Sequence, residues 1–530
     1  MAALAAGARA PSVHPGREDG AVRILIFHGY LLRGTGSNIY NAELAAALVR
    51  GGHEVHLLCQ EREPLELGWV DAVGDWDGGA LEIRVRREPV RATVYRPDVG
   101  GLLPVYVADR YDGVEARPFP DLDEAEVTGY VERNVAAVAE VAARARPDVA
   151  LANHQVMGPQ ILARGLGAAA VPYAVKIHGS ALEYTVKPHP RFKPAAYAGL
   201  AGARGVLVGS RHTAESLWAA LPEDPGLPAR TRLGPPGVDV QAFAPRTPAA
   251  AAAGVAGLRD RLAAAGPGET GSSFARDARA ASTALAGLEP ERDRLVVFVG
   301  KLIASKGVEL LLAAFPLVLA RVPSARLLIV GFGAFRPQLE EFAAALAHGD
   351  LAGARALRGE DGRELPELAA FLSGPVVATP GYRAAAAGLA DRVGWVGRLE
   401  HGELTDVLPA AEALAMPSTF PEAFGMVAAE AAACGALPVV AAHSGMAEVA
   451  RALAAAVPAP IAPWLTFAVG PDSVGQLADN LAGWLEAPDD LRARTREAIV
   501  GVARERYSWD GVARTVIAAA RGELAGLPSP

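Results

Sequence analysis

Two glutamates with a defined spacing give the first chemical signal in the chain. Glu422 and Glu430 stand eight residues apart in a segment that begins at Pro417, directly after a predicted strand ending at Met416. We expect a helix from about Glu422 that stops at Gly435, so the two carboxylates would lie about 80° apart around it and about 12 Å apart along it. That separation suits one carboxylate on a sugar and the other on the ribose of a nucleotide sugar. The alternative is two solvated glutamates on an alanine-rich helix, which the strand-to-helix corner disfavours.

The start of the same predicted helix offers backbone groups for an anion. Free N–H groups at Ala423, Phe424 and Gly425 would bind a negative charge, and the helix dipole would stabilise it further. Gly425 carries no side chain that could hold a phosphate or sugar away. The sequence therefore predicts an anion site next to the two carboxylates.

Lysine is rare in this chain, and its positions are informative. Of the 51 basic residues, the lysines are Lys176, Lys187, Lys193, Lys301 and Lys306. The last two stand in a short loop between a predicted strand and the next predicted helix. Cationic groups at that place would neutralise a departing diphosphate. Chance clustering of solvated lysines is the alternative, which the strong preference for arginine elsewhere disfavours.

The elements that must position these groups are buried strands alternating with helices. Continuous apolar runs indicate strands buried on both faces, and their alternation with helices predicts a parallel sheet covered on both sides. In the first half we expect strands at 22–27, 54–59, 148–152, 172–177 and 205–208, and helices at 38–50, 123–145, 156–164 and 211–220.

A second run of the same alternation begins at the strand 295–299. Residues 1–20 are expected to be a disordered leader, 246–292 is an Ala/Gly-rich linker or insertion, and 350–390 stays unassigned. The fold class is therefore α/β, with two doubly wound Rossmann-like domains at 21–245 and 293–505. Ligands would bind between them, at the carboxyl ends of the strands.

Length and composition exclude several classes of protein. A chain of 530 residues needs at least two domains. Its net charge of −8 argues against nucleic acid or anionic lipid as the main partner. No apolar run is long enough for a transmembrane segment, and no signal peptide is recognisable. Cys59 and Cys434 fit buried thiols better than a disulfide. We therefore expect a cytoplasmic protein. The sequence offers no cluster of metal ligands, so no metal is expected.

These motifs resemble those of the retaining glycosyltransferases of the GT4 group, which have the two-domain GT-B fold. The loop Gly300–Gly307 resembles the family's Gly-Arg-Leu…Lys-Gly, Glu422–Glu430 resembles its Glu-x7-Glu signature, and Leu233–Pro245 resembles the crossing into its second domain. The similarity extends from Arg23 to about Arg521. It departs at Lys301, where the family usually has arginine, and in the long insertion at 247–292.

The resemblance implies a role for each matching residue. Lys306 and Lys301 would hold the diphosphate, Glu422 the donor sugar and Glu430 the ribose, with His178 on the sugar side. Donor contacts would also come from the glycine loop of the first domain, from the segment after Glu422 and from a nucleobase shelf: Gly36, Ala423, Phe424, Gly425, Met426, Arg398, Leu399 and Leu404. Asn38 and Tyr40 are weaker candidates for acceptor contact, and a helix within 506–530 would cross back to the first domain.

The implied reaction is transfer of a sugar from a nucleoside-diphosphate sugar to an acceptor hydroxyl, with retention of configuration and without metal or cofactor. The acceptor would be a small molecule, a glycan or a lipid-linked sugar. The nucleobase, the sugar and the acceptor stay open, because backbone contacts and loops at about 60–125 and 180–195 decide them.

Two other classes of protein fit these residues less well. A dinucleotide-dependent oxidoreductase would use Gly34, Gly36 and Glu61, but Ile39 occupies the third glycine position and the loop before Gly34 is too long for the tight turn. An inactive sugar-nucleotide-binding or scaffolding relative would be expected to have lost Glu422, Lys306 or Gly425, and all three are present.

Overall fold

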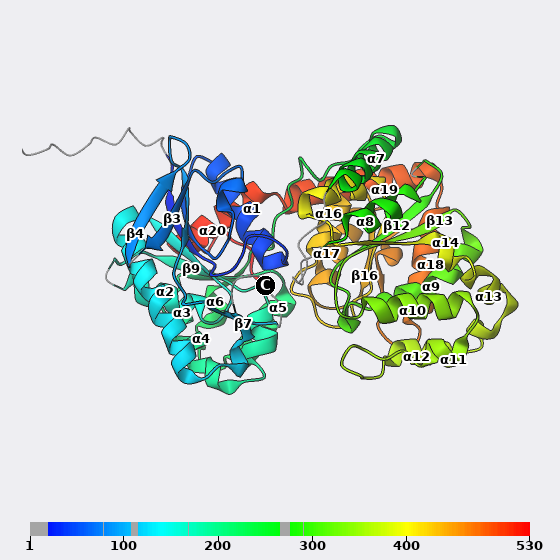
Figure 1. The fold of residues 1–530 in the computed structure, drawn as a ribbon, viewed down its shortest axis with the longest axis horizontal. Coiled ribbons are helices and arrows are strands. Elements are labelled where there is room, and N and C mark those ends of the chain that lie inside the picture. Colours follow the sequence, from blue (N-terminus) through cyan, green and yellow to red (C-terminus); the bar gives the residue numbers. More distant parts are fainter. Residues whose placement is uncertain (1–19, 78, 108–114, 168, 266–275, 290) are drawn as a thin grey trace, which may run out of the picture.

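The chain folds into two lobes that lie side by side (Figure 1). The structure is a computed structural model, and it describes residues 20–77, 79–107, 115–167, 169–265, 276–289 and 291–530. The expected leader, apart from its last residue, lies outside the described residues. Both lobes are built on largely parallel sheets covered by helices, which confirms the α/β class.

The first domain is built on a nine-stranded sheet. Its strand order is β11-β10-β9-β8-β1-β2-β5-β3-β4, and all neighbours are parallel except β3 and β4. Residues 24–27 of β1 are at most 2% exposed, because this strand is covered on both faces. The strands are β1 (Arg23–Phe27), β2 (Glu54–Leu58), β3 (Ala72–Asp77), β4 (Ala80–Val85), β5 (Ala92–Arg96), β8 (Val149–Asn153), β9 (Tyr173–Lys176), β10 (Gly205–Val208) and β11 (Thr231–Leu233).

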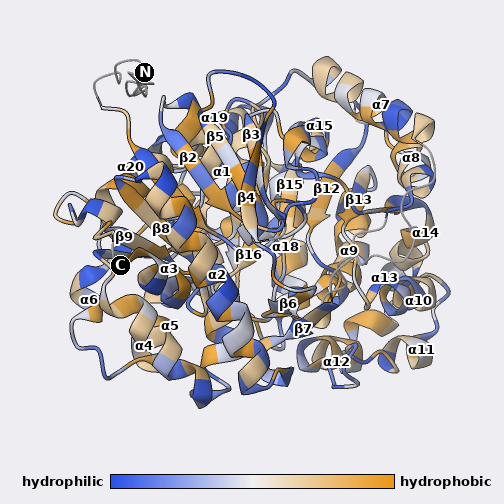
Figure 2. Cartoon of the chain, turned by 60° about the vertical axis from the view of Figure 1, so that its left-hand side comes forward, coloured by the Kyte–Doolittle hydropathy of each residue, from blue (hydrophilic) through white to orange (hydrophobic). Residues whose placement is uncertain are grey.

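Helices cover both faces of this sheet, and the chain between β5 and the helix α2 forms a small separate pair of strands. Blue residues lie largely on the outer turns of the helices, and the central strands are mostly orange (Figure 2). The sequence analysis did not assign β3, β4 and β5. The elements are α1 (Gly36–Arg50), α2 (Glu124–Ala145), α3 (Gly158–Leu166), α4 (Lys193–Ala201), α5 (Arg211–Ala220), β6 (Leu102–Val105) and β7 (Glu115–Pro118).

The second domain has a six-stranded, fully parallel sheet in the order β14-β13-β12-β15-β16-β17. Its strands are β12 (Arg294–Val299), β13 (Ala325–Val330), β14 (Val393–Gly397), β15 (Ala413–Met416), β16 (Leu437–Ala441) and β17 (Thr466–Phe467). The main helices are α9 (Val308–Arg321), α10 (Arg336–Ala347), α16 (Met426–Cys434), α17 (Ser444–Ala454), α18 (Ser473–Glu486) and α19 (Asp489–Arg506).

The segment 246–292, expected to be an Ala/Gly-rich linker or insertion, is in its described residues a packed part of the second domain. They form two helices, α7 (Pro248–Ala264) and α8 (Ala278–Ala286), which pack on each other and on the second domain. Leu258 and Leu285 are buried in the core of that domain. Alanine has the highest helix propensity, so a composition typical of linkers also favours helix wherever apolar residues recur at helical spacing.

The segment 350–390, unassigned from the sequence, is also helical. It contains four helices of eight residues or fewer, and prolines at the first helical position begin two of them. Helices this short give too few turns for an apolar period to be recognised. They are α11 (Leu351–Arg355), α12 (Pro366–Ser373), α13 (Pro380–Ala386) and α14 (Leu389–Arg392).

The last helix, α20 (Trp509–Arg521), packs on the first domain although it follows the second in sequence. It contacts α1, β8, β9 and β10. Trp509 is buried, and a Cβ on Gly237 would lie only 2.4 Å from its ring, so the chain crosses between the domains at close packing. Within the described residues, no helix combines the length and the apolar character that a membrane span requires.

Candidate functional site

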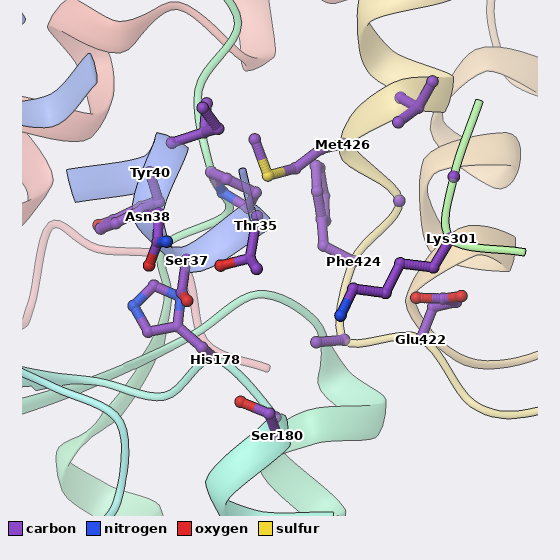
Figure 3. Close-up of a pocket in the computed structure, with 18 of the residues that line it drawn as sticks. Thr35, Ser37, Asn38, Tyr40, His178, Ser180, Lys301, Glu422, Phe424 and Met426 are labelled. Carbon is purple, nitrogen blue, oxygen red and sulfur yellow. The ribbon is translucent and has the colours of Figure 1, made fainter. Parts of the chain in front are cut away.

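A cavity of about 560 Å³ lies between the domains, beyond the carboxyl ends of strands from both sheets. In Figure 3, Asn38, Tyr40 and His178 of the first domain face Lys301 and Glu422 of the second. All fifteen residues predicted from the sequence line this cavity: Gly36, Asn38, Tyr40, His178, Lys301, Lys306, Arg398, Leu399, Leu404, Glu422, Ala423, Phe424, Gly425, Met426 and Glu430.

Glu422 and Lys306 form an ion pair on the second-domain wall. The ammonium of Lys306 donates to Oε1 of Glu422, and the hydroxyl of Ser418 donates to the same oxygen at 2.8 Å. Burial alone would raise the pKa of Glu422, but these two donors outweigh burial and lower the pKa. The pair therefore presents a carboxylate that stays ionised and a cation fixed beside it.

The predicted start of the helix after the first glutamate is wrong. Helix α16 begins at Met426, and Gly425 before it has a φ of +129° that no helical residue adopts. Glu422 therefore lies in the preceding loop, and the helical spacing between the two glutamates does not apply. The amides of Met426 and Val427 have no intrahelical acceptor, since they open the helix, and both residues line the cavity.

Packing of a glycine sets the position of the lysine loop. Gly307 has a φ of +66°, and a Cβ there would lie 2.0 Å from the carbonyl oxygen of Pro417. The loop after β12 is thus pressed against the corner that follows β15. This contact brings Lys306 next to Glu422, while Lys301 extends into the space beside Phe424 (Figure 3).

Glu430 is buried at 2% exposure on α16 and accepts a hydrogen bond from Nε2 of His401 at 2.8 Å. Burial would lower the pKa of His401, but the carboxylate of Glu430 outweighs it and raises the pKa. The sequence analysis did not single out His401. Its only sequence signal is its place just after Arg398 and Leu399, at the carboxyl end of β14.

On the first-domain wall, the glycine loop leads into α1. A Cβ at Gly36 would stand 3.8 Å from Sδ of Met426, so this loop faces α16 across the cavity. The amide of Asn38 is bonded within its own domain: Nδ2 donates to the carbonyl oxygen of Arg33 at 2.6 Å, and Oδ1 accepts from Nε2 of His28 at 3.1 Å. Asn38 therefore holds the loop in place, while the buried hydroxyl of Tyr40 has no partner among the described residues.

The hydrogen bonds of His178 define its tautomer. Nε2 donates to Oδ1 of Asn153 at 2.8 Å, and the amide of Asn153 donates to the carbonyl oxygen of Phe27 at 3.2 Å. Burial, together with His154 and Lys176, lowers the pKa of His178 well below its ordinary value. The ring is therefore neutral, and its Nδ1 can accept a hydrogen bond.

Family models match most of both halves. One described as "Glycosyl transferase 4-like domain" matches residues 35–225, and two described as "Glycosyl transferases group 1" match 293–361 and 354–500. The chain belongs to the group 1 glycosyltransferases. The region 354–500 includes Arg398, Leu399 and Leu404. The guanidinium of Arg398 pairs with Glu400 at 2.8 Å.

Curated relatives match parts of this chain. The D-inositol 3-phosphate glycosyltransferase of Segniliparus rotundus is 30% identical over 262 residues, which cover 49% of this chain and 46% of the relative. An uncharacterised glycosyltransferase of Methanocaldococcus jannaschii is 26% identical, covering 42% of this chain and 44% of that protein. The chain thus spans about half the length of these relatives.

Solved structures share the architecture over nearly the whole chain. The sucrose-phosphate synthase of Thermosynechococcus elongatus has a TM-score of 0.57 at 18% identity, covering 95% of this chain and 99% of that one. HepE of Anabaena, in complex with UDP and glucose, has a TM-score of 0.53 at 16% identity, covering 94% and 98%. At these identities the likeness shows the shared GT-B fold alone.

Two histidines at or beside the cavity were not predicted from the sequence: His154 lines it, and His28 stacks on His154. His28 follows β1 and His154 follows β8, so both stand where parallel strands end at one edge of the sheet. Their position at the ends of predicted strands was therefore the sequence signal that could have identified them. Among the described residues, no group of three or more His, Cys, Asp or Glu is arranged to hold a metal ion.

Proposed function

We propose that this protein transfers a sugar from a nucleoside-diphosphate sugar to an acceptor hydroxyl, with retention of anomeric configuration and without a divalent cation. The observation that carries the proposal is the Lys306–Glu422 pair, which stands beside the open amides of α16 and faces His178 across the cavity. The HepE structure, whose complex contains UDP and glucose, supports the choice of donor class.

The leaving diphosphate would be stabilised by fixed charge and by backbone dipoles. Lys301 and Lys306 supply cations, and Met426 and Val427, which line the cavity, stand at the positive end of α16. Negative charge grows on the diphosphate as the sugar–phosphate bond breaks, so groups held in advance stabilise the transition state more than the bound donor. With two lysines in place, the reaction would not need a metal ion for this step.

The sugar and the ribose would be held by separate carboxylates. Glu422 stays ionised and can accept hydrogen bonds from sugar hydroxyls, and Nδ1 of His178 can accept another from the opposite wall. Glu430 would accept from the ribose, with His401 fixing its carboxylate. Retention follows from the family resemblance, and the anomeric configuration of the product, read by NMR, tests it.

The central experiment measures nucleoside-diphosphate release from UDP-, GDP- and ADP-sugars with a mixture of acceptors, with and without excess EDTA. Thermal unfolding with each nucleoside diphosphate runs alongside, because a ligand at about 100 times its dissociation constant stabilises by roughly 2.7 kcal/mol. We expect one nucleoside diphosphate to stabilise the protein and its sugar to be turned over in EDTA. Stabilisation without turnover would indicate an inactive relative, and turnover restored by magnesium or manganese would contradict metal independence.

A further inference from the structure

Tyr30, Tyr106, His154 and His178 line the cavity from the first-domain side, and His28 stacks on His154 without lining it. We call these five rings the aromatic lobe. Four ring centroids surround that of His154, at 4.6 Å for Tyr106, 4.9 Å for His178, 5.3 Å for Tyr30 and 5.8 Å for His28. His154 lines the cavity although it is only 2% exposed. The proposed binding of the donor uses no atom of His154.

Two groups at this wall have unused hydrogen-bonding capacity. Neither ring nitrogen of His154 nor the hydroxyl of Tyr40 has a hydrogen-bond partner among the described residues. The neighbouring tyrosines are satisfied, since the hydroxyl of Tyr30 donates to Pro104 at 2.9 Å and that of Tyr106 donates to Val156. A buried polar group without a partner costs free energy, so a ligand that supplies one binds favourably there.

The charge state of the lobe distinguishes between ligand classes. Burial, and the proximity of His28, lowers the pKa of His154 well below its ordinary value, and burial lowers that of His28 to about 4. A neutral imidazole offers one donor and one acceptor, which matches a hydroxyl group. A phosphate or carboxylate oxygen only accepts, so the ring's lone pair would face a negative charge.

Cations for an anionic ligand are also scarce on this wall. Apart from histidines, Lys176 is the one basic residue that the described part of the first domain contributes to the lining. Its ammonium already donates to the carbonyl oxygen of Gly234 at 2.5 Å, and burial lowers its pKa to about 7. Recognition of a phosphate normally uses arginine or lysine with free donors.

Part of the cavity lining is both apolar and exposed to solvent. Val107, Tyr184 and Phe420 are 42%, 43% and 39% exposed, and all three line the cavity. The rings of Tyr184 and Phe420 come from different domains and stack at 6.0 Å with an interplanar angle of 17°. Such a surface suits the apolar face of a sugar or cyclitol ring more than a hydrated anion.

We propose that the acceptor is an uncharged polyhydroxy compound, a sugar or a cyclitol, whose hydroxyls bind His154 in the aromatic lobe and Tyr40 beside it. This rests on the proposed function and narrows it. An uncharged acceptor would distinguish this protein from the relatives named D-inositol 3-phosphate glycosyltransferase, because that name includes a phosphate.

The test measures binding of matched pairs to the protein saturated with whichever nucleoside diphosphate stabilises it. The pairs are myo-inositol with inositol 3-phosphate and glucose with glucose 6-phosphate. Ligand-observed NMR measures the binding of each compound. We expect the neutral member of at least one pair to bind about tenfold more tightly than its phosphate, and His154→Phe to weaken that binding about tenfold. His154→Arg should shift the preference toward the phosphate.

His348→Phe is the matched control, because His348 is exposed on the second domain and does not line the cavity. Nucleoside-diphosphate binding to each variant shows that the fold and donor side are intact. The acceptor assignment would be overturned if the phosphate bound more tightly than its neutral partner in both pairs, or if none of the four compounds bound. It would also be overturned if His154→Phe bound the neutral compound as tightly as the unmodified protein does. Loss of nucleoside-diphosphate binding in the unmodified protein would instead count against the proposed function.

Discussion

Lys306 is the residue on which the proposed chemistry depends most. Its ammonium is fixed by Glu422 at the cavity wall, so replacing it with alanine removes a cation and leaves a carboxylate without its partner. We expect Lys306→Ala to lower turnover by on the order of 10²–10³, as for loss of one preorganised electrostatic donor. Lys306→Arg should restore only part of the turnover, because the planar guanidinium of arginine does not reproduce the point charge of an ammonium. Turnover at saturating donor and acceptor is the measurement.

Two further variants control for this prediction. Lys193 begins α4 and does not line the cavity, so Lys193→Ala should leave turnover unchanged. Lys301→Arg should be nearly neutral, because it restores the residue usual in the family. Near-normal turnover of Lys306→Ala would assign the leaving-group role to other residues.

The two glutamates should separate in steady-state kinetics. A sugar contact that strengthens as the bond breaks affects turnover, whereas a ribose contact is made equally in the ground and transition states. We expect Glu422→Ala to lower kcat and Glu430→Ala to raise the KM for the donor, each by roughly tenfold or more. The reverse pattern would exchange the two roles.

The His401–Glu430 pair predicts a pH-dependent contribution to stability. The pKa of folded His401 lies above 6.5, so its stabilisation is complete below that value and is lost as pH rises through the folded pKa. Glu430→Gln should therefore lower the unfolding temperature more near pH 6 than near pH 9. The exposed His348 provides a control substitution, His348→Gln, for which no such difference is expected. An equal loss at both pH values would contradict the charged pair.

Among the elements, the loop between β12 and α9 depends on Gly307, where any side chain is costly. Gly307 combines a positive φ with a Cβ position 2.0 Å from the oxygen of Pro417, whereas Gly362 has a φ of +79° and open space around it. Gly362→Ala should cost about 1 kcal/mol, the strain of the left-handed region alone. Gly307→Ala should cost roughly 2–5 kcal/mol, because the clash adds to that strain. Urea unfolding of both variants, with turnover of each, makes the comparison, and equal costs would show that the contact with Pro417 is unimportant.

At the scale of the whole molecule, one carboxylate of the second domain caps a helix of the first. The two oxygens of Glu448, on α17, accept from the backbone amides of Arg211 and His212 at 2.9 Å and 3.0 Å, where α5 begins. Helix caps contribute roughly 0.5–2 kcal/mol, so Glu448→Ala should raise the KM for the donor roughly 2- to 30-fold by depopulating the arrangement in which both domains line the cavity.

Glu215→Ala is the control for this contact, because Glu215 pairs with Arg211 inside α5 and does not reach the second domain. Its donor KM should not change. Small-angle scattering should show Glu448→Ala as more extended than the unmodified protein, and an unchanged donor KM with unchanged scattering would refute a role for the contact in holding that arrangement.

Local sequence patterns predicted the fold class, and the residues that they assigned to a site line one cavity. A strand covered on both faces must be apolar along its length, which made β1 and β12 recognisable from local composition. Parallel strands end at the same edge of a sheet, so motifs at strand ends converge without knowledge of the packing. For that reason residues as distant as Gly36 and Glu430 could be assigned to one cavity.

The way in which those residues meet depends on tertiary packing. Helix α16 begins at Met426 and not at Glu422, because Gly425 adopts a positive φ and the amide of Gly445 bonds the carbonyl oxygen of Glu422 at 2.9 Å. Packing likewise turned the alanine-rich segment around Leu258 into helices. The position of His154 among four rings depends on contacts between strands far apart in sequence, which local patterns do not encode.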